Sequence, residues 1–124
     1  MSAHASFRAA IEAGDHAAMV AAFAPDAVLN SPVSFKPFEG REAISQLLAI
    51  LLETFEDFHY TDELEADGTA ALIFRTHIGD RQLEGLDLFR FDAEGQITEL
   101  TVMVRPLSGV IALAEAVGPK LAPA

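Results

Sequence analysis

Three segments with the residue pattern of β-strands limit the possible folds of this chain more than any other feature of the sequence. They cover residues 70–78, 82–91 and 97–105, and each is rich in aliphatic, aromatic and β-branched side chains. Gly79-Asp80 separates the first two segments, and a short Asp-Ala-Glu-Gly stretch separates the last two. Both separators are typical of tight turns between antiparallel strands. The sequence therefore predicts a three-stranded antiparallel meander.

Apolar residues spaced three or four positions apart predict four helices. Two short helices lie on either side of Gly14-Asp15, where glycine suits a helix end and aspartate suits an N-cap. The next helix begins after Arg41, and its apolar stripe consists of Ile44, Leu47, Leu48, Leu51, Leu52 and Phe55. The last helix is expected at residues 108–117, where a Gly-Pro pair ends it.

Two further segments read as strands. Residues 27–30 predict a short strand before a loop that contains two prolines. Residues 53–67 carry seven carboxylates and no lysine or arginine, which we interpret as a solvated strand at a sheet edge. Helices followed by strands in one chain of this length predict a single α+β domain covering residues 1–124.

Composition excludes several classes of function. Eight basic and 19 acidic residues leave a net charge of −11, which argues against nucleic acid and membrane partners. The absence of cysteine excludes disulfides and thiol nucleophiles. No apolar run approaches the ~20 residues of a membrane span. The first residues lack the pattern of a secretory signal, so the cytoplasm is the expected location.

The two-residue turn at Gly79-Asp80 also predicts a register. It pairs Leu72 with Asp87, and pairing across the second turn places Asp87 opposite Leu100. The face that carries Asp87 is otherwise almost wholly apolar; its other members are Leu72, Phe74, Thr76, Leu83, Gly85, Phe89, Phe91, Thr98, Leu100, Val102 and Val104. An ionised carboxylate there needs a hydrogen-bond partner or a raised pKa, so Asp87 is the first candidate functional residue. The alternative is a hydrogen-bonded carboxylate in a filled core.

The opposite face of the meander predicts a subunit contact. Its apolar centre consists of Leu86, Leu88, Ile97 and Met103, and charged residues surround it. An apolar centre with a charged rim is typical of a dimer interface, so we expect a homodimer through this face. A register slipped by one residue would instead turn Arg75 and His77 inward.

The order of these elements resembles the nuclear transport factor 2-like (cystatin-like) superfamily, which includes ketosteroid isomerases and SnoaL-like polyketide cyclases. The resemblance runs from about Phe7 to Arg105. Four strings carry it, namely Ala13-Gly14-Asp15, Phe23-Ala24-Pro25-Asp26-Ala27-Val28, Phe38-Glu39-Gly40-Arg41-Glu42-Ala43-Ile44 and Leu86-Asp87-Leu88-Phe89-Arg90-Phe91-Asp92 followed by Gly95. It implies a cone in which a curved antiparallel or mixed sheet and N-terminal helices enclose a pocket, with an extra C-terminal helix here.

The resemblance also implies a set of pocket residues. In this sequence they are Phe7, Asn30, Ser31, Phe55, Leu72, Phe74, Phe89, Leu100 and Val102. In ketosteroid isomerases a general-base aspartate acts with a tyrosine and a protonated aspartate. The protonated aspartate corresponds to Asp87, but the tyrosine corresponds to Phe7 and the base to Ser31. Phe7 has no donor and serine alone is no base near neutral pH, so a ketosteroid isomerase is not expected.

The histidines offer one further candidate. His59 precedes Tyr60 at the start of the acidic segment, and alternation leaves open whether it faces the pocket. If it does, His59 is the plausible base near neutral pH. His16, His59 and His77 lack the spacing of a metal triad, so neither a metal nor a cofactor is expected.

These observations together predict a protein that binds a small, largely apolar organic molecule in a conical pocket. Asp87 and His59 are the candidate catalytic residues for an isomerase, dehydratase or cyclase reaction without a cofactor. The alternative is a non-catalytic ligand-binding or dimeric interaction module.

Overall fold

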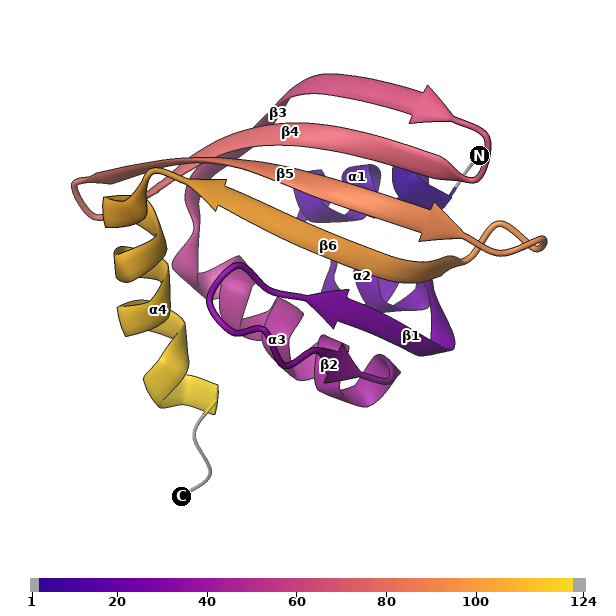
Figure 1. Cartoon of the computed structure of the whole chain (residues 1–124), viewed down its shortest axis with the longest axis horizontal. Helices are drawn as coiled ribbons and strands as arrows, with labels where there is room; N and C mark the ends of the chain where they lie inside the picture. Colours follow the sequence, from indigo (N-terminus) through magenta and orange to yellow (C-terminus); the bar gives the residue numbers. More distant parts are fainter. Residues whose placement is uncertain (1–2, 122–124) are drawn as a thin grey trace.

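The computed structural model describes residues 3–121 and has the predicted mixture of helices and strands (Figure 1). In chain order the elements are α1 (Ala3–Ala13), α2 (His16–Ala21), β1 (Phe23–Asn30), β2 (Phe38–Glu39), α3 (Arg41–Thr54), β3 (Glu56–Ala66), β4 (Thr69–Ile78), β5 (Arg81–Phe91), β6 (Ile97–Arg105) and α4 (Leu107–Leu121). The break between α1 and α2 lies at the predicted place, because the Asp15 side chain accepts a hydrogen bond from the Ala18 amide as an N-cap.

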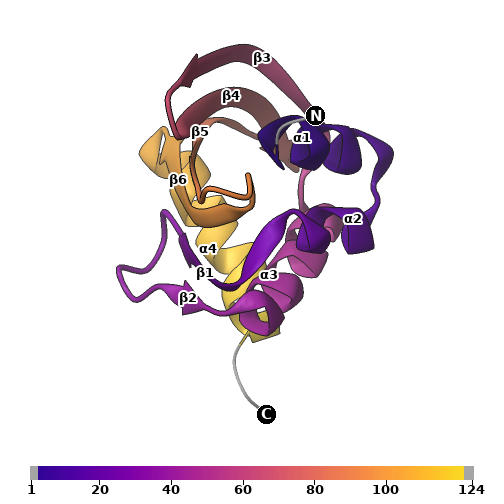
Figure 2. The same ribbon diagram turned by 90° about the vertical axis from the view of Figure 1, so that its right-hand side faces the viewer.

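The strands form one curved, mixed sheet in the order β2-β1-β6-β5-β4-β3. β1 pairs with β6 in parallel, and the other neighbours are antiparallel. Helices α1, α2 and α3 lie on the concave side of the sheet, and α4 lies at one end of it (Figure 2). Among the described residues, no helix combines the length and hydropathy that a membrane crossing needs.

The predicted β4–β5 register is confirmed, with Ile78 opposite Arg81 and Leu72 opposite Asp87. The predicted β5–β6 register is wrong, because Asp87 lies opposite Val102 rather than Leu100. At the turn Phe91 lies opposite Ile97 rather than Gln96, and an irregularity between Arg90 and Phe91 shifts the pairing by one further residue beyond this point. The two shifts together preserve the alternation, so Leu100, Val102 and Val104 still share the face of Asp87.

The position of Ile97 also differs from the prediction. Ile97 lies opposite Phe91 and next to Phe23 of β1, and it is fully buried in the core. Thr98 takes the outer position instead, where its hydroxyl donates to the Arg90 carbonyl. Ile97 is therefore not part of the outer face from which a subunit contact was predicted.

Strand β1 begins four residues earlier than predicted, at Phe23. Its pairing with β6 shifts between Phe23 and Val28, which accommodates Pro25 and its missing amide donor. The short strand β2 was not predicted, and it pairs with β1 through Phe38 opposite Leu29. Two residues carry too little alternation for a sequence pattern to reveal a strand.

Helix α4 is longer than predicted at both ends. It continues through Pro119 to Leu121, because Gly118 does not take the positive φ of a helix-ending glycine and Leu121 packs against the core. Near its start, a Cβ on Gly109 would lie 2.8 Å from Leu83 Cγ, so the helix approaches β5 closely. The helix contacts α3 and strands β4, β5 and β6.

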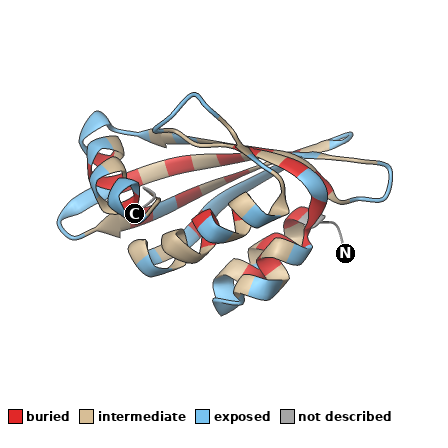
Figure 3. Ribbon diagram, turned by 90° about the horizontal axis from the view of Figure 1, so that it is seen from below, coloured by how far each residue is buried: buried red, intermediate tan, exposed pale blue. Residues whose placement is uncertain are grey.

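The core lies between the sheet and the helices, where Figure 3 shows the buried residues. Its largest fully buried side chains are Phe7, Met19, Phe23, Leu29, Ile44, Leu72, Phe74, Phe89, Ile97 and Leu100. Strand β3 lies at the sheet edge, as predicted, and most of its side chains are exposed.

Strand β3 contains two irregularities that decide which of its side chains turn inward. The first lies between Glu56 and His59, and the second lies between Tyr60 and Asp62. The extra residue at the second one reverses the alternation. Glu63 therefore lies on the same side of the strand as Tyr60, toward α1, whereas Leu64 is 59% exposed.

Candidate functional site

A cavity of about 580 Å³ lies between the helices and the concave face of the sheet. All four helices, the loop after β1 and several strands contribute to its wall. Most of the lining side chains are apolar, and the polar ones are Glu12, Ser31, Ser34 and Asp87. No lysine, arginine or histidine lines this cavity among residues 3–121. Its volume and apolar character are those of a small-molecule site.

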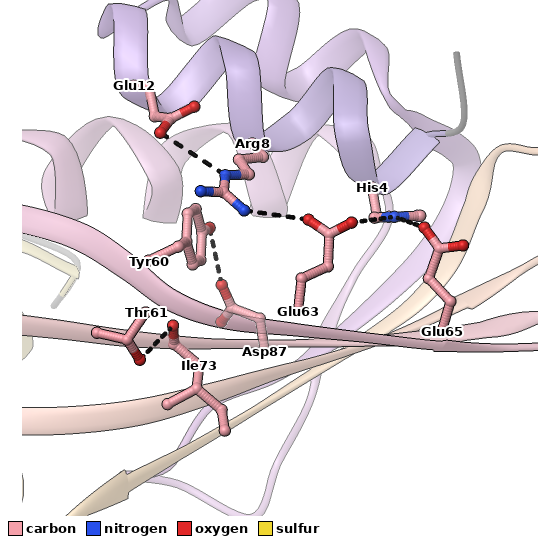
Figure 4. Close-up of polar contacts among 9 residues, drawn as sticks. All are labelled: His4, Arg8, Glu12, Tyr60, Thr61, Glu63, Glu65, Ile73 and Asp87. Carbon is pink, nitrogen blue, oxygen red and sulfur yellow. Dashed lines mark hydrogen bonds and ion pairs between the residues drawn. The ribbon is translucent and has the colours of Figure 1, made fainter.

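Asp87 is the buried carboxyl group of this cavity. Its strand, β5, lies in the middle of the sheet, and the residue is 5% exposed. The Tyr60 hydroxyl, from the edge strand β3, donates a hydrogen bond to Asp87 Oδ2 at 3.1 Å (Figure 4). The geometry thus joins a central strand to the sheet edge through two polar side chains.

Burial determines the protonation states of Asp87 and Tyr60. It raises the pKa of Asp87 to about 7, because a carboxylate loses hydration there, and the hydrogen bond from Tyr60 opposes this shift. Burial, followed by the charge of Asp87, raises the pKa of Tyr60 far above its usual range. Tyr60 therefore remains a hydrogen-bond donor, while Asp87 exchanges a proton near neutral pH.

Three phenylalanines form one wall of the cavity. The rings of Phe58 and Phe74 stack with their centroids 4.7 Å apart, and Phe55 stacks on Phe58 at 5.6 Å. Phe74 lies over Gly85, where an added Cβ would be only 2.1 Å from the ring. Glycine at position 85 is therefore what allows the ring to lie against the sheet.

Residues 4–100 match the family described as the SnoaL-like domain. The chain belongs to this family. It is 36% identical over 101 residues to a steroid Delta-isomerase of Nocardioides simplex, covering 78% of this chain and 82% of that protein. The crystal structure of a steroid delta-isomerase from Pseudomonas aeruginosa is 37% identical, with a TM-score of 0.91 over 96% of this chain and 88% of that one.

An uncharacterized protein from Silicibacter pomeroyi with a cystatin-like fold gives a similar result. It is 25% identical, with a TM-score of 0.90 over 95% of this chain and 84% of that one. These relatives support the fold that the sequence resemblance implied.

Most of the pocket residues expected for this SnoaL-like domain do line the cavity. Besides Asp87 they are Phe7, Ser31, Phe55, Phe74, Leu100 and Val102. Leu72 and Phe89 lie on the predicted face but are fully buried in the core, where Phe7 packs edge-on against Phe89. Neither residue is among those that line the cavity.

Asn30 also lies outside this cavity. Its amide nitrogen donates to Glu99 Oε2 at 2.9 Å and to Thr101 Oγ1 at 3.0 Å on the other side of the sheet. Alternation along β1 explains the correction, since Leu29 takes the inward position and Asn30 the outward one. Asn30 instead borders a shallow hollow beside the loop after β1.

His59 is not placed to act as the base in this SnoaL-like domain. Its side chain is exposed, and its Nδ1 lies 3.0 Å from the Asp57 carbonyl oxygen, away from the cavity. The irregularity before His59 turns Phe58 and Tyr60 inward, so the histidine between them faces solvent. The alternation of the sequence left the direction of His59 open, and the structure turns its side chain away from the cavity.

Tyr60 was not predicted as a site residue. Two signals could have indicated it: it is the only tyrosine in the chain, and it shares the alternation of Phe58. If His59 faces solvent, both of its neighbours face inward. The tyrosine of this site thus comes from β3 rather than from position 7 on α1, which holds a phenylalanine.

One group among residues 3–121 has the composition of a metal site. It consists of His4, Glu63 and Glu65, at the contact between α1 and β3. His4 Nε2 lies 2.5 Å from Glu65 Oε1 and 3.4 Å from Glu63 Oε2. Glu63 also accepts a hydrogen bond from Arg8 Nη1 at 3.1 Å, so a guanidinium already matches its charge.

Proposed function

We propose that this SnoaL-like domain binds a neutral, largely apolar small molecule that carries a carbonyl or hydroxyl group, and that Asp87 transfers a proton on that molecule. The observation that carries this proposal is the position of Asp87, a 5% exposed carboxyl group on the wall of an apolar cavity. A pKa of about 7 supplies both of its protonation states at neutral pH.

The preference for a neutral ligand rests on the charges around the cavity. The charged side chains among its described lining residues are Glu12 and Asp87, and both are acidic. No basic side chain lines this cavity in the described part of the chain to pair with a carboxylate or phosphate. An anionic group would therefore enter without a counter-charge, at a large desolvation cost.

Asp87 could perform the proton transfer as a single acid/base group. As a carboxylate it takes a proton from a carbon next to a carbonyl; the C–H bond breaks, an O–H bond forms, and the electron pair moves into the enolate. Return of that proton to another carbon breaks the O–H bond, forms a new C–H bond and restores the carboxylate. Isomerase, dehydratase and cyclase reactions share this first step.

Steroid isomerisation is a second candidate, because two relatives are named steroid delta-isomerases. Two residues oppose the mechanism of ketosteroid isomerases in this chain. Phe7 has no hydroxyl, and the Ser31 Oγ accepts hydrogen bonds from the amides of Val33 and Ser34 within its own turn. We therefore expect no turnover of a β,γ-unsaturated 3-ketosteroid to its conjugated isomer by ultraviolet absorbance. Turnover that Asp87→Asn abolished would contradict this expectation and favour steroid isomerisation.

The proposed function predicts binding and hydrogen exchange. A saturated, neutral 3-ketosteroid, which has no double bond to isomerise, is the first probe, and a steroid of the same ring system with a carboxylate is its matched counterpart. Calorimetry is expected to show binding of the ketone and at least tenfold weaker binding of the acid. In deuterated buffer the protein is expected to incorporate deuterium beside the carbonyl, as measured by mass spectrometry. Asp87→Asn is expected to lower that rate at least tenfold and to retain binding.

Each other outcome has a definite meaning. Binding without exchange would support the non-catalytic alternative. If the carboxylate steroid bound as tightly as the ketone, the proposed preference for a neutral ligand would be wrong. If neither this ketone nor smaller neutral cyclic ketones bind to the folded protein, the proposed function is wrong.

We also propose that the domain forms a homodimer through its outer sheet face. Support comes from Leu86 and Leu88, which are half-buried there, and from Met103, which is 52% exposed. Ion pairs within the chain surround this centre, including Arg75 with Glu84 and Arg90 with Glu99. A second copy would cover the apolar centre without burying an unpaired charge.

Light scattering at micromolar concentration is expected to give the mass of a dimer. Leu88→Glu places a carboxylate in the centre of the proposed contact and is expected to produce a monomer. Ile111→Glu is the matched control, because Ile111 is exposed on helix α4 rather than on the sheet. A wild-type monomer, or a dimer that persists in Leu88→Glu, would refute the proposed face.

A further inference from the structure

Helix α1 and the edge strand β3 make a polar contact beside the Tyr60–Asp87 pair (Figure 4). Arg8 of α1 lies at its centre, with its guanidinium carbon 5.4 Å from the centroid of the Tyr60 ring. Arg8 Nη1 donates to Glu63 Oε1 at 3.1 Å, and Arg8 Nε lies 3.6 Å from Glu12 Oε2. The guanidinium thus contacts the tyrosine face and one carboxylate on each of the two elements.

Backbone pairing alone holds this part of β3 weakly. Only β4 is its neighbour in the sheet, and the pairing shifts between Tyr60 and Asp62, directly beside the tyrosine. A strand edge with an unpaired residue offers few hydrogen bonds to fix a side chain. The contact from Arg8 falls at this interruption, because the shift turns Glu63 toward α1.

We propose that Arg8 is a positioning residue for the site: it holds the Tyr60 ring and the adjacent turn of β3 against α1, so that the tyrosine hydroxyl stays on Asp87. A cation over an aromatic face is attracted to it, and a guanidinium also binds a carboxylate through its planar edge. Arg8 acts on Asp87 only through Tyr60. The inference rests on the proposed role of Asp87 for its meaning in catalysis, but not for its test.

The charges around Tyr60 agree with this arrangement. Arg8 and Glu12 approach it from α1, Asp87 approaches from β5, and Glu63 follows it on β3. Arg8 lowers the pKa of Tyr60, whereas burial, Asp87 and Glu12 raise it. The Tyr60 hydrogen bond in turn lowers the pKa of Asp87. Loss of the Arg8 contact should therefore appear at Asp87 as an upward shift.

The test is a double-mutant cycle read by carbon-detected NMR titration of Asp87. Tyr60→Phe is expected to raise the pKa of Asp87 by about one, the size expected for one hydrogen bond to a charged group. Arg8→Met, which keeps an apolar stem, is expected to raise it by at least half as much. In the Tyr60→Phe background, Arg8→Met is expected to cause no further change in the pKa of Asp87. Arg8→Lys is expected to restore part of the wild-type value, since lysine keeps the charge without the planar edge.

Arg75→Met is the matched control, because Arg75 forms an ion pair with Glu84 and lies opposite His59 on the exposed side of the sheet. It is expected to leave the pKa of Asp87 unchanged. An unchanged pKa in Arg8→Met, or an equal shift in the presence and absence of the tyrosine hydroxyl, would overturn the inference. The pKa of Asp87 is measured without a substrate. Failure of the proposed function would therefore not affect the interpretation of this test.

Discussion

Replacement of Asp87 by asparagine is expected to make the protein about 4 kcal/mol more stable than the wild type at pH 8. Burial raises the pKa of Asp87 from 3.8 to about 7 in the folded protein. Between these two values the folded state keeps a proton that the unfolded chain has lost. Each pH unit in this window therefore lowers the free energy of unfolding by about 1.4 kcal/mol.

Asparagine removes this cost because it stays neutral. Its side-chain oxygen can still accept the hydrogen bond from Tyr60 that Asp87 accepts at 3.1 Å. The stabilising effect of the substitution should be absent near pH 4, grow as pH rises, and level off above pH 7. Asp87 contributes stability fully below its unfolded pKa, and that contribution is lost as pH rises through its folded pKa.

Urea denaturation of both proteins at several pH values checks this prediction. Asp80→Asn is the matched control, since the Asp80 side chain is 98% exposed in the turn after β4. It is expected to change stability little at any pH. A difference between wild type and Asp87→Asn that does not depend on pH would show that Asp87 ionises as it does in the unfolded chain.

Gly85→Ala is expected to cost about 1–3 kcal/mol of stability and to reduce the cavity. A Cβ at position 85 would lie 2.1 Å from Phe74 Cζ, so the ring must move. The ring already stacks on Phe58 and is 1% exposed, and the open space beside it is the cavity. The substitution is therefore expected both to disturb the packing of Phe74 and to reduce the volume that the cavity offers to a ligand.

Thermal denaturation and calorimetry with the neutral ketone measure the two effects of Gly85→Ala. Phe74→Leu in the same chain provides the rescue, because a smaller side chain leaves room for the new methyl group. Gly85→Ala is expected to be less harmful in the Phe74→Leu background than in the wild type. Equal costs in both backgrounds would mean that the ring does not lie over position 85.

The sheet register shows which structural details a sequence can predict. A two-residue turn leaves one register for its hairpin, so the pairing of Leu72 with Asp87 followed directly from Gly79-Asp80. The longer turn after Phe91 is compatible with several registers, and the irregularity beside it has no sequence signature. Ile97 was therefore placed on the wrong face, whereas residues further along β6 kept the right one.

The site was predictable to a similar degree. Asp87 stood out because a lone carboxylate on an apolar face is costly wherever the strand lies. Tyr60 did not stand out, because its direction depends on the shift before His59, which arises only when the strand pairs with β4. Likewise, which face of β1 Asn30 takes depends on how the strand pairs with β6.

The acidic character of β3 bears on whether the free edge of the sheet adds strands from other molecules at high concentration. A free sheet edge can add a strand from another molecule, and a regular, uncharged edge does so most readily. Here two shifts in pairing break the regularity of the edge, and exposed carboxylates repeat along it. The same strand that supplies Tyr60 to the site therefore discourages growth of the sheet from one molecule into the next.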